Sequence, residues 1–319
     1  MQSSKKHKEG NVTRMEELLE RLLEECRSYT RLGELADYIP ELAKADKEDF
    51  GVYLVSSDGK EFSAGDYNKR FTIQSIVKPL LLLLALMDNG TEYVRQYIGV
   101  EATGKPFNAI DYSEQLILKE HINPMVNIGA IEMCSMIHGE SYEERFERLL
   151  AFTRRIAGNP EIDVDQAVYL SEKKTGNKNR ALAYLLKSSG IIDDDVEELL
   201  DIYFRACSIR VTCKDLANIG FVLANHGRGK KPEDVLFSGH HARFVNAILT
   251  TCGMYDGSGD FAIKVGLPAK SGVGGGIMAV SPTRMGIGIY SPGLDKKGNS
   301  LAGIKMLEKL SEILYLSIF

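Results

Sequence analysis

The sequence predicts an α+β fold, in which both ends of the chain form one antiparallel sheet and a helical block is inserted between them. Three observations predict it. Strand-like runs gather at residues 51–65 and again after residue 240, and they read as adjacent hairpins, which pair antiparallel. Between about 91 and 225, apolar residues recur at helical spacing. The 319 residues are 44% hydrophobic, which is enough for a large core.

The elements follow in order along the chain. A helix is predicted over 13–29, where Thr13 and Glu16 have capping-box spacing. A hairpin follows over 51–65 with its turn at Asp58-Gly59, and the next helix stops at 88–90. Further helices are expected at 142–157, 181–188, 193–207, 215–225 and 301–316, with Gly-rich strands and few helical signals between 240 and 292.

The domain organisation follows from these elements. Residues 1–12 are expected to be a disordered tail, which carries the basic cluster 5–8. Residues 13–90 and 226–319 are expected to form the sheet subdomain, and residues 91–225 the inserted helical subdomain. The active site is expected between the two.

Composition excludes several classes of function. The net charge is −5 and no basic stripe is present, so no nucleic-acid partner is expected. The apolar run at 80–87 is too short to span a bilayer, so no membrane association is expected. Five scattered cysteines without a CxxC predict a reducing cytoplasm rather than a disulfide framework. The six histidines lack metal-binding spacing, so no metal is expected.

Two nucleotide-binding motifs are nearly present and are rejected. Residues 99–105 resemble a phosphate-binding loop, but Pro106 stands where Ser or Thr would hold Mg²⁺. The Gly-rich run 272–276 is not GxGxxG and opens no helix, which argues against a dinucleotide site. No cofactor is therefore expected.

The segment TIQSIVKPL at 72–80 carries the first catalytic candidates. Ser-x-x-Lys is the nucleophile motif of serine β-lactamases and penicillin-binding proteins, but this chain contains it four times. Only Ser75 and Lys78 stand at the head of an apolar helix. There the helix N-terminus favours a developing oxyanion, and burial would lower the pKa of Lys78, so that it can accept the serine proton.

A second motif strengthens this interpretation. Enzymes of that group also need Lys-Ser/Thr-Gly on a strand beside the serine. Residues 174–176 match within a polar stretch, and Lys270-Ser271-Gly272 match within a strand-like run. The second copy could place the amide of Val273 opposite Ser75 as an oxyanion donor. The third element, Ser-x-Asn or Tyr-x-Asn, is missing, which predicts the same scaffold with a different substrate.

At this point the chain resembles the serine-dependent glutaminases, which include bacterial enzymes and the catalytic domain of the kidney-type and liver-type enzymes. The resemblance runs from about residue 36 to the C-terminus. It is carried by ADYIPEL (36–42), QSIVKP (74–79), GTEYV (90–94), NPMVNIGAI (123–131), SEKKTGNKNRALAY (171–184), IYFRACSIRVTC (202–213), TCGMYDGSG (251–259) and GLPAKSGVGGGI (266–277).

The resemblance implies a β-lactamase-like fold and a hydrolase acting on the side-chain amide of L-glutamine through a γ-glutamyl-serine intermediate. It implies Ser75 as nucleophile, Lys78 as its base, Tyr255 as a partner in proton transfer and the Val273 amide as an oxyanion donor. It also implies a homodimer or homotetramer. The residues it assigns to substrate binding, together with Ser75, Tyr255 and Val273, are Tyr38, Asn127, Glu172, Asn179 and Tyr203.

Two alternatives stay open. One is a β-lactamase or peptidase-like serine acyl hydrolase on the same scaffold, against which the missing third motif argues. The other is a non-catalytic binding protein for glutamine or a peptide. A glutaminase is favoured because nucleophile, lysine, tyrosine and strand motif occur together.

Overall fold

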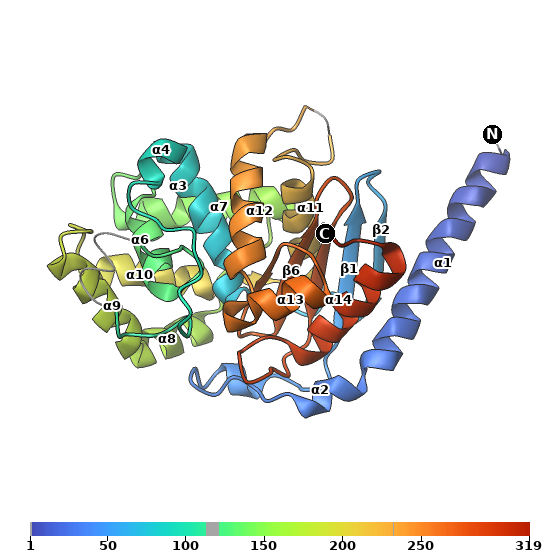
Figure 1. Cartoon of the computed structure of the whole chain (residues 1–319), viewed down its shortest axis with the longest axis horizontal. Helices are drawn as coiled ribbons and strands as arrows, with labels where there is room; N and C mark the ends of the chain where they lie inside the picture. Colours follow the sequence, from blue (N-terminus) through green and yellow to red (C-terminus); the bar gives the residue numbers. More distant parts are fainter. Residues whose placement is uncertain (1, 113–120, 232) are drawn as a thin grey trace.

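The sheet at the centre of the molecule is formed by both ends of the chain. The computed structural model describes residues 2–112, 121–231 and 233–319 (Figure 1). Its main sheet has the order β2-β1-β7-β6-β5, and every neighbouring pair is antiparallel. The strands are β1 (Gly51–Ser56), β2 (Glu61–Gly65), β5 (Ala269–Ser271), β6 (Gly276–Ser281) and β7 (Met285–Tyr290). The predicted fold class is therefore confirmed.

Successive residues of β1 point to opposite faces of the sheet, as the period of a strand requires. Val52 and Leu54 belong to the core beneath α1 (Gln2–Cys26) and α14 (Leu301–Leu314), whereas Tyr53 and Val55 belong to the larger core on the other side. Both faces are buried, which explains why β1 reads as a continuous apolar run rather than an alternating one.

Helix α11 (Cys213–Ala224) lies directly on the strand β7, on the face opposite α14 (Figure 1). A Cβ atom added to Gly288 would stand 2.0 Å from the carbonyl oxygen of Cys213, and one added to Gly286 would stand 2.1 Å from that of Ala217. Glycine at these two positions therefore allows the helix backbone to approach the strand.

The remaining helices form a largely separate group around α3 (Lys78–Asn89). Leu80 to Leu86 are all buried, so this helix is apolar on every side and is enclosed by its neighbours. The predicted helix at 142–157 is α7 (Tyr142–Ala157). The others are α4 (Thr91–Val94), α6 (Asn127–Ser135), α8 (Gln166–Thr175), α9 (Asn177–Ser188) and α10 (Val196–Cys207).

Three expectations differ from the structure. Helix α1 begins at Gln2, across the expected tail: Lys, Glu and Gln among residues 2–12 favour helix, and Gly10 does not interrupt it. Helices α12 (Gly239–Cys252) and α13 (Ser258–Lys264) occupy the region where few helical signals were expected, although Ala242, Val245 and Leu249 do follow helical spacing. Helix α11 contacts the sheet, although it was assigned to the inserted block. The division into two subdomains stays a prediction.

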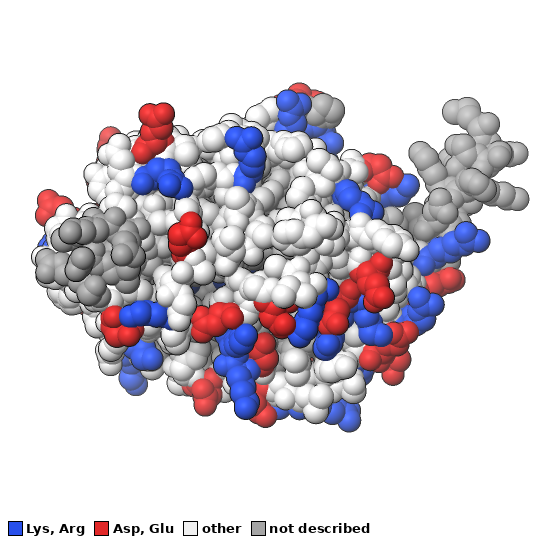
Figure 2. All heavy atoms as spheres, viewed as in Figure 1, with Lys and Arg blue, Asp and Glu red and all other residues white. Residues whose placement is uncertain are grey.

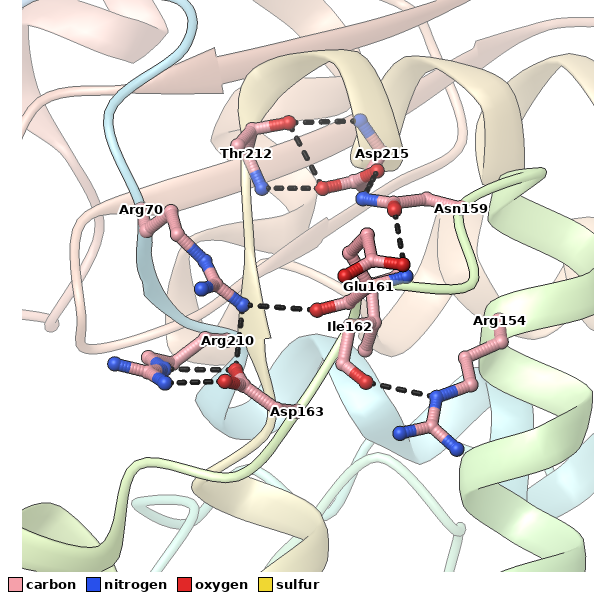
Figure 3. Close-up of polar contacts among 9 residues, drawn as sticks. All are labelled: Arg70, Arg154, Asn159, Glu161, Ile162, Asp163, Arg210, Thr212 and Asp215. Carbon is pink, nitrogen blue, oxygen red and sulfur yellow. Dashed lines mark hydrogen bonds and ion pairs between the residues drawn. The ribbon is translucent and has the colours of Figure 1, made fainter.

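A small second sheet lies where the chain passes from the main sheet to the helices and back. Strand β3 (Phe71–Thr72) pairs with β4 (Arg210–Val211), three residues before Ser75. Figure 3 shows the carboxylate of Asp163 between Arg70 and Arg210; the Arg210 Nε–Asp163 Oδ1 distance is 2.8 Å. These contacts connect the segment that enters the helical region, at Arg70, to the segment that leaves it, at Arg210.

Short elements complete the fold. They are α2 (Ser28–Leu32) and the 3₁₀ turns η1 (Leu42–Lys44), η2 (Gln74–Val77) and η3 (Tyr255–Gly257). Among the described residues, no helix has both the length and the apolarity that a membrane crossing needs. Acidic and basic side chains are interspersed over the face in Figure 2, without a continuous basic stripe.

Candidate active site

Ser75 lies in the 3₁₀ turn η2, directly before α3. Its side chain is 5% exposed. Just before this turn, the Ile73 backbone N–H donates a hydrogen bond of 2.7 Å to the Ile209 carbonyl. The preceding residue, Gln74, has φ of 49°, in the left-handed region that non-glycine residues rarely adopt. Such backbone strain gathers at functional sites. The serine thus stands at the head of the apolar helix, as the sequence predicts.

Lys78 is completely buried at the first position of α3. Its ammonium donates to Asn127 Oδ1 at 2.7 Å and to the Met125 carbonyl at 3.2 Å; neither bond goes to Ser75. Burial lowers the pKa of Lys78 to about 8, and the nearby Cys207 and Glu172 only partly oppose this. Roughly a tenth of Lys78 is therefore neutral at pH 7, far more than for an exposed lysine, and a general base needs this neutral form.

Tyr255 lies in η3 with φ of 52°, so after Gln74 it is another residue near Ser75 with a left-handed backbone. Burial raises the pKa of its hydroxyl well above the usual range, while the Ser75 side chain and the Val273 amide act in the opposite direction. These two groups therefore lie close to the hydroxyl, although no described group completes a hydrogen bond with it. The phenol keeps its proton at neutral pH.

Lys270 and Ser271 of the strand motif lie on β5, the edge of the sheet, and the turn that begins at Gly272 rests against the serine segment. A Cβ atom added to Gly272 would stand 2.8 Å from the Ile73 carbonyl oxygen, and one added to Gly274 would stand 2.8 Å from that of Thr72. Because only glycine allows this approach, the Val273 amide is held beside Ser75. Among the described residues, that amide has no acceptor.

Lys270 is the second completely buried lysine of the site. Its ammonium donates to the carbonyls of Gly253 and Ser271 at 3.0 and 2.8 Å and lies 4.3 Å from the centroid of the Tyr255 ring. Burial, together with the neighbouring Lys78, lowers the pKa of Lys270 well below its usual value. The two lysines thus disfavour one another's charge. The other copy of the motif, 174–176, is at the end of α8 and not on a strand.

A cavity of about 220 Å³ opens at Ser75, and we call it the substrate cavity. It brings together six of the predicted residues, which come from four different helices, the serine turn and the loop before η1. They are Tyr38, Ser75, Asn127, Glu172, Asn179 and Tyr203. Lys78, Tyr255 and Val273 stand beside the cavity rather than in its lining.

The polar groups of the cavity form a connected set. Asn127 links Lys78 to the cavity, because its Nδ2 donates to Asn179 Oδ1 at 2.9 Å while its Oδ1 accepts from Lys78. Burial raises the pKa of Glu172 to about 8, and the charge of Lys78 opposes this. Its Oε2 is buried without a partner among the described residues. An unpaired buried carboxyl is costly, which marks it as a group that awaits a ligand.

Tyr38 and Tyr203 both line the cavity but differ in exposure. Tyr203 on α10 is 2% exposed, whereas Tyr38 is 49% exposed at the mouth. Burial nevertheless raises the pKa of the Tyr38 hydroxyl, and the neighbouring Tyr255 and Glu172 add to this. The exposed ring therefore turns its hydroxyl end inward.

Sequence reasoning missed several lining residues. Phe107 contacts the Tyr255 ring at a centroid distance of 4.6 Å, and its carbonyl accepts the Asn127 amide at 2.9 Å. Cys207 adds a buried thiol. Neither residue has a sequence signal. Phe107 lies in a loop with no apolar periodicity, and Cys207 is indistinguishable in sequence from the core residues of α10. The other unassigned lining residues are Ile39, Gln74, Asn108 and 175–178.

The described ranges contain no group of three or more His, Cys, Asp or Glu placed to hold a metal ion. All five cysteines are buried and free. The chemistry that this arrangement supports is acyl transfer by a serine, with a buried lysine, a protonated tyrosine and an unpaired amide around it.

Comparison with known proteins agrees with this chemistry. The family model described as Glutaminase matches residues 33–319. A glutaminase of Clostridium tetani is 54% identical over 305 residues, covering 96% of this chain and all of the relative. Glutaminase 2 of Clostridium perfringens is 53% identical over the same shares.

Solved structures are similar as well. The probable glutaminase from Bacillus subtilis complexed with 6-diazo-5-oxo-L-norleucine is 36% identical with a TM-score of 0.87, covering 95% of this chain and 97% of the other. Another structure, of the covalent complex between the Bacillus subtilis glutaminase and 5-oxo-L-norleucine, has the same identity and TM-score and covers 95% and 99%.

Proposed function

This chain belongs to the glutaminase family, and on that premise we propose that it hydrolyses the side-chain amide of L-glutamine through an ester on Ser75. The products are L-glutamate and ammonia. The observation that carries the proposal is the convergence of Ser75, the buried Lys78 and the unpaired Val273 amide at one cavity. The fold and the overall reaction class agree with the full-length relatives.

In the first half of the reaction, the Ser75 oxygen attacks the amide carbon while Lys78 takes its proton. A pKa of about 8 leaves Lys78 partly neutral at physiological pH, so that it can act as the base. The charge that develops on the carbonyl oxygen is stabilised by the amides of Ser75 and Val273. Removing one such donor typically costs about 10²–10³ in kcat.

Tyr255 supplies the proton that the departing ammonia needs. Its raised pKa keeps the phenol protonated, which suits a donor better than a base, and Lys78 then restores the proton. Water attacks the ester in the second half, through a second oxyanion at the same two amides. The Bacillus glutaminase forms a covalent complex with 5-oxo-L-norleucine, a glutamine analogue whose C5 ketone corresponds to the amide carbonyl of glutamine, and this supports a nucleophile in the mechanism.

The amino-acid end of glutamine lies at the other side of the cavity. Its ammonium pairs with Glu172, and the bound cation lowers the pKa of that carboxyl and makes it ionise. Its carboxylate accepts from Asn127, Asn179 and the hydroxyls of Tyr38 and Tyr203. An analogue that lacks either end leaves buried polar groups unpaired and is rejected.

The remaining proposals follow the resemblance. No metal or organic cofactor is needed, and L-glutamine is the small-molecule substrate. The chain acts in a reducing cytoplasm, which its five free cysteines support. It assembles as a homodimer or homotetramer, and light scattering would show this directly.

The test is ammonia release by Ser75→Ala. We expect at least a 10³-fold loss of kcat and no ester detectable by mass spectrometry, with an unchanged thermal unfolding midpoint. Ser57→Ala is the matched control, because Ser57 belongs to another Ser-x-x-Lys copy in the β1–β2 turn. Near-normal ammonia release from folded Ser75→Ala would overturn the mechanism. Parallel assays on asparagine and a β-lactam separate the alternative hydrolase.

A further inference from the structure

The loop at residues 295–299, between β7 and α14, lies next to the turn that carries Tyr255. Asp295 closes this loop, because its Oδ1 accepts the backbone N–H of Asn299 at 3.0 Å and its own N–H donates to the Asn299 carbonyl at 2.8 Å. A Cβ atom added to Gly298 would stand 3.6 Å from Cε2 of the Tyr255 ring. We call residues 295–299 the support loop, because they lie against the ring of the proposed proton donor.

The support loop bonds the backbone on both sides of Tyr255. Asn299 Nδ2 donates to the Met254 carbonyl at 3.3 Å, and Lys297 Nζ donates to the Asp256 carbonyl at 3.2 Å. The residue between these two carbonyls has the left-handed φ of 52°, a strained conformation that persists only where the surroundings hold it. The support loop therefore supplies part of what keeps the Tyr255 backbone in place.

The Asn299 side chain is only half satisfied. It is 1% exposed, and its Oδ1 is buried without a partner among the described residues. An unpaired buried oxygen raises the free energy of the folded state. The Met254 carbonyl, in contrast, also accepts the Gly257 N–H at 3.0 Å, so it would stay paired without Asn299. Stability alone therefore gives little reason for an asparagine at this position.

Tyr255 is sensitive to its support because its hydroxyl stands at the far end of a rigid ring. A small rotation of the Tyr255 peptide is therefore magnified at the phenol oxygen. In the proposed function this oxygen delivers a proton to the departing nitrogen, and a misplacement of about 1 Å can cost about 10²-fold in rate. Burial raises the pKa of the hydroxyl, and the charge of Asp295 adds to this, so the carboxylate of the support loop lies close enough to affect the phenol.

We propose that Asn299 is a positioning residue for the first half of the reaction, which holds the Tyr255 peptide so that the phenol reaches the departing nitrogen. This inference rests on the proposed function. In that step the bond between Ser75 Oγ and the amide carbon forms, the carbon–nitrogen bond breaks, and the Tyr255 proton goes to the nitrogen. Asn299 exchanges no proton and is not among the residues that line the substrate cavity. It acts through the Met254 carbonyl.

The first readout is the dependence on the leaving group. Asn299→Leu removes the donating Nδ2 and the unpaired oxygen in a side chain of similar size. We expect kcat/KM for glutamine, which reports the steps up to ester formation, to fall roughly 10- to 100-fold. For the γ-methyl ester of L-glutamate, kcat/KM should fall by less than about threefold, because methoxide departs with less help from an acid than an amide nitrogen does.

The second readout is a double-mutant cycle with Tyr255→Phe, which removes the phenol oxygen. If Asn299 acts by placing that oxygen, Asn299→Leu should cause no further loss of kcat/KM for glutamine once the oxygen is gone. A general disturbance of the fold would instead lower the activity of Tyr255→Phe by the same factor as that of the wild type.

Asn218→Leu is the matched control. Asn218 on α11 is also buried, its Oδ1 is also unpaired among the described residues, and its Nδ2 donates to the Ala157 carbonyl at 2.9 Å. That carbonyl ends α7 and accepts from no backbone N–H of the described residues, so Asn218 satisfies a helix end. Asn218→Leu should therefore lower the thermal unfolding midpoint more than Asn299→Leu does, and should leave kcat/KM for glutamine unchanged.

Each result decides the inference. A normal kcat/KM for glutamine in Asn299→Leu, an equal loss with the ester, or a loss that adds in full to that of Tyr255→Phe overturns it and leaves the proposed hydrolysis intact. If Asn299→Leu does not fold, Asn299→Asp gives the same comparisons, because its carboxylate keeps the shape and cannot donate. A fully active Tyr255→Phe enzyme overturns the inference together with the proton-donor role of Tyr255. A wild type that releases no ammonia refutes the proposed function itself.

Discussion

Replacing Asn127 with aspartate should move the pH dependence of catalysis upward. The Asn127 side-chain oxygen accepts from the Lys78 ammonium at 2.7 Å. Aspartate has the same shape but carries a full negative charge at this position. An opposite charge at about 4 Å is worth about 4 kcal/mol at an effective dielectric constant of 20, and measured shifts for such pairs are about one to three pKa units.

The size of the effect follows from the pKa of Lys78. A pKa of about 8 would rise to roughly 9–11. Because only neutral Lys78 accepts the serine proton, kcat near pH 7 should fall about 10- to 1,000-fold. The loss should shrink as the pH approaches the new pKa. The KM should rise as well, since Asn127 also bonds Asn179.

The assay is kcat for ammonia release between about pH 6 and 11, with the unfolding midpoint measured at each pH. Asn127→Ser is the control, because it removes the same bond without adding charge and should lose activity evenly across the range. An Asn127→Asp enzyme that is impaired equally at pH 7 and pH 10 would refute the assignment of Lys78 as the base.

Three further outcomes are expected. Burial holds the pKa of Glu172 near 8, above its usual value of 4.5, so between pH 4.5 and 8 the carboxyl ionises in the unfolded chain but not in the folded one. The stability of the empty enzyme should therefore fall by up to about 1.4 kcal/mol per pH unit over that range; thermal unfolding should show this, and Glu172→Gln should abolish it. Gly288→Ala should destabilise by about 1–3 kcal/mol in urea titrations, because its Cβ would clash with the Cys213 carbonyl, whereas Gly259→Ala should not. Asp163→Asn should lower the free energy of unfolding by about 1 kcal/mol or less, as expected for a part-exposed ion pair, and should leave kcat within about tenfold of the wild-type value. A larger loss of kcat would show that the second sheet positions the nucleophile.

The sequence predicts those parts of the fold that local pattern determines. Helix α7 has clear amphipathic spacing and a serine cap, and its predicted bounds match the structure. The β1–β2 hairpin follows from its Asp58-Gly59 turn. Helix α12 was missed because Gly-rich neighbours hid its spacing, and the place of α11 on the sheet depends on glycines of β7 that are distant in sequence.

In the candidate site, too, some residues are predictable from local sequence pattern and others are not. Ser75 and Lys78 are visible from their placement before an apolar helix, and the strand motif at 270–272 follows from its β-like surroundings. The substrate-binding residues come together only through the tertiary fold, so the family resemblance was needed to select them. Phe107 had no signal of either kind, because a loop residue acquires its role only from the ring it contacts.

The pairing of β1 with β7 has a consequence for biosynthesis. Gly51 is opposite Tyr290, so the centre of the sheet cannot close until almost all of the chain has been made. At roughly 5–20 residues per second, the ribosome leaves β1 without its partner for about ten seconds or longer. Throughout that time an apolar strand edge is exposed to other nascent chains. The yield of active enzyme should therefore depend on chaperones during translation and fall sharply when the last strands are removed.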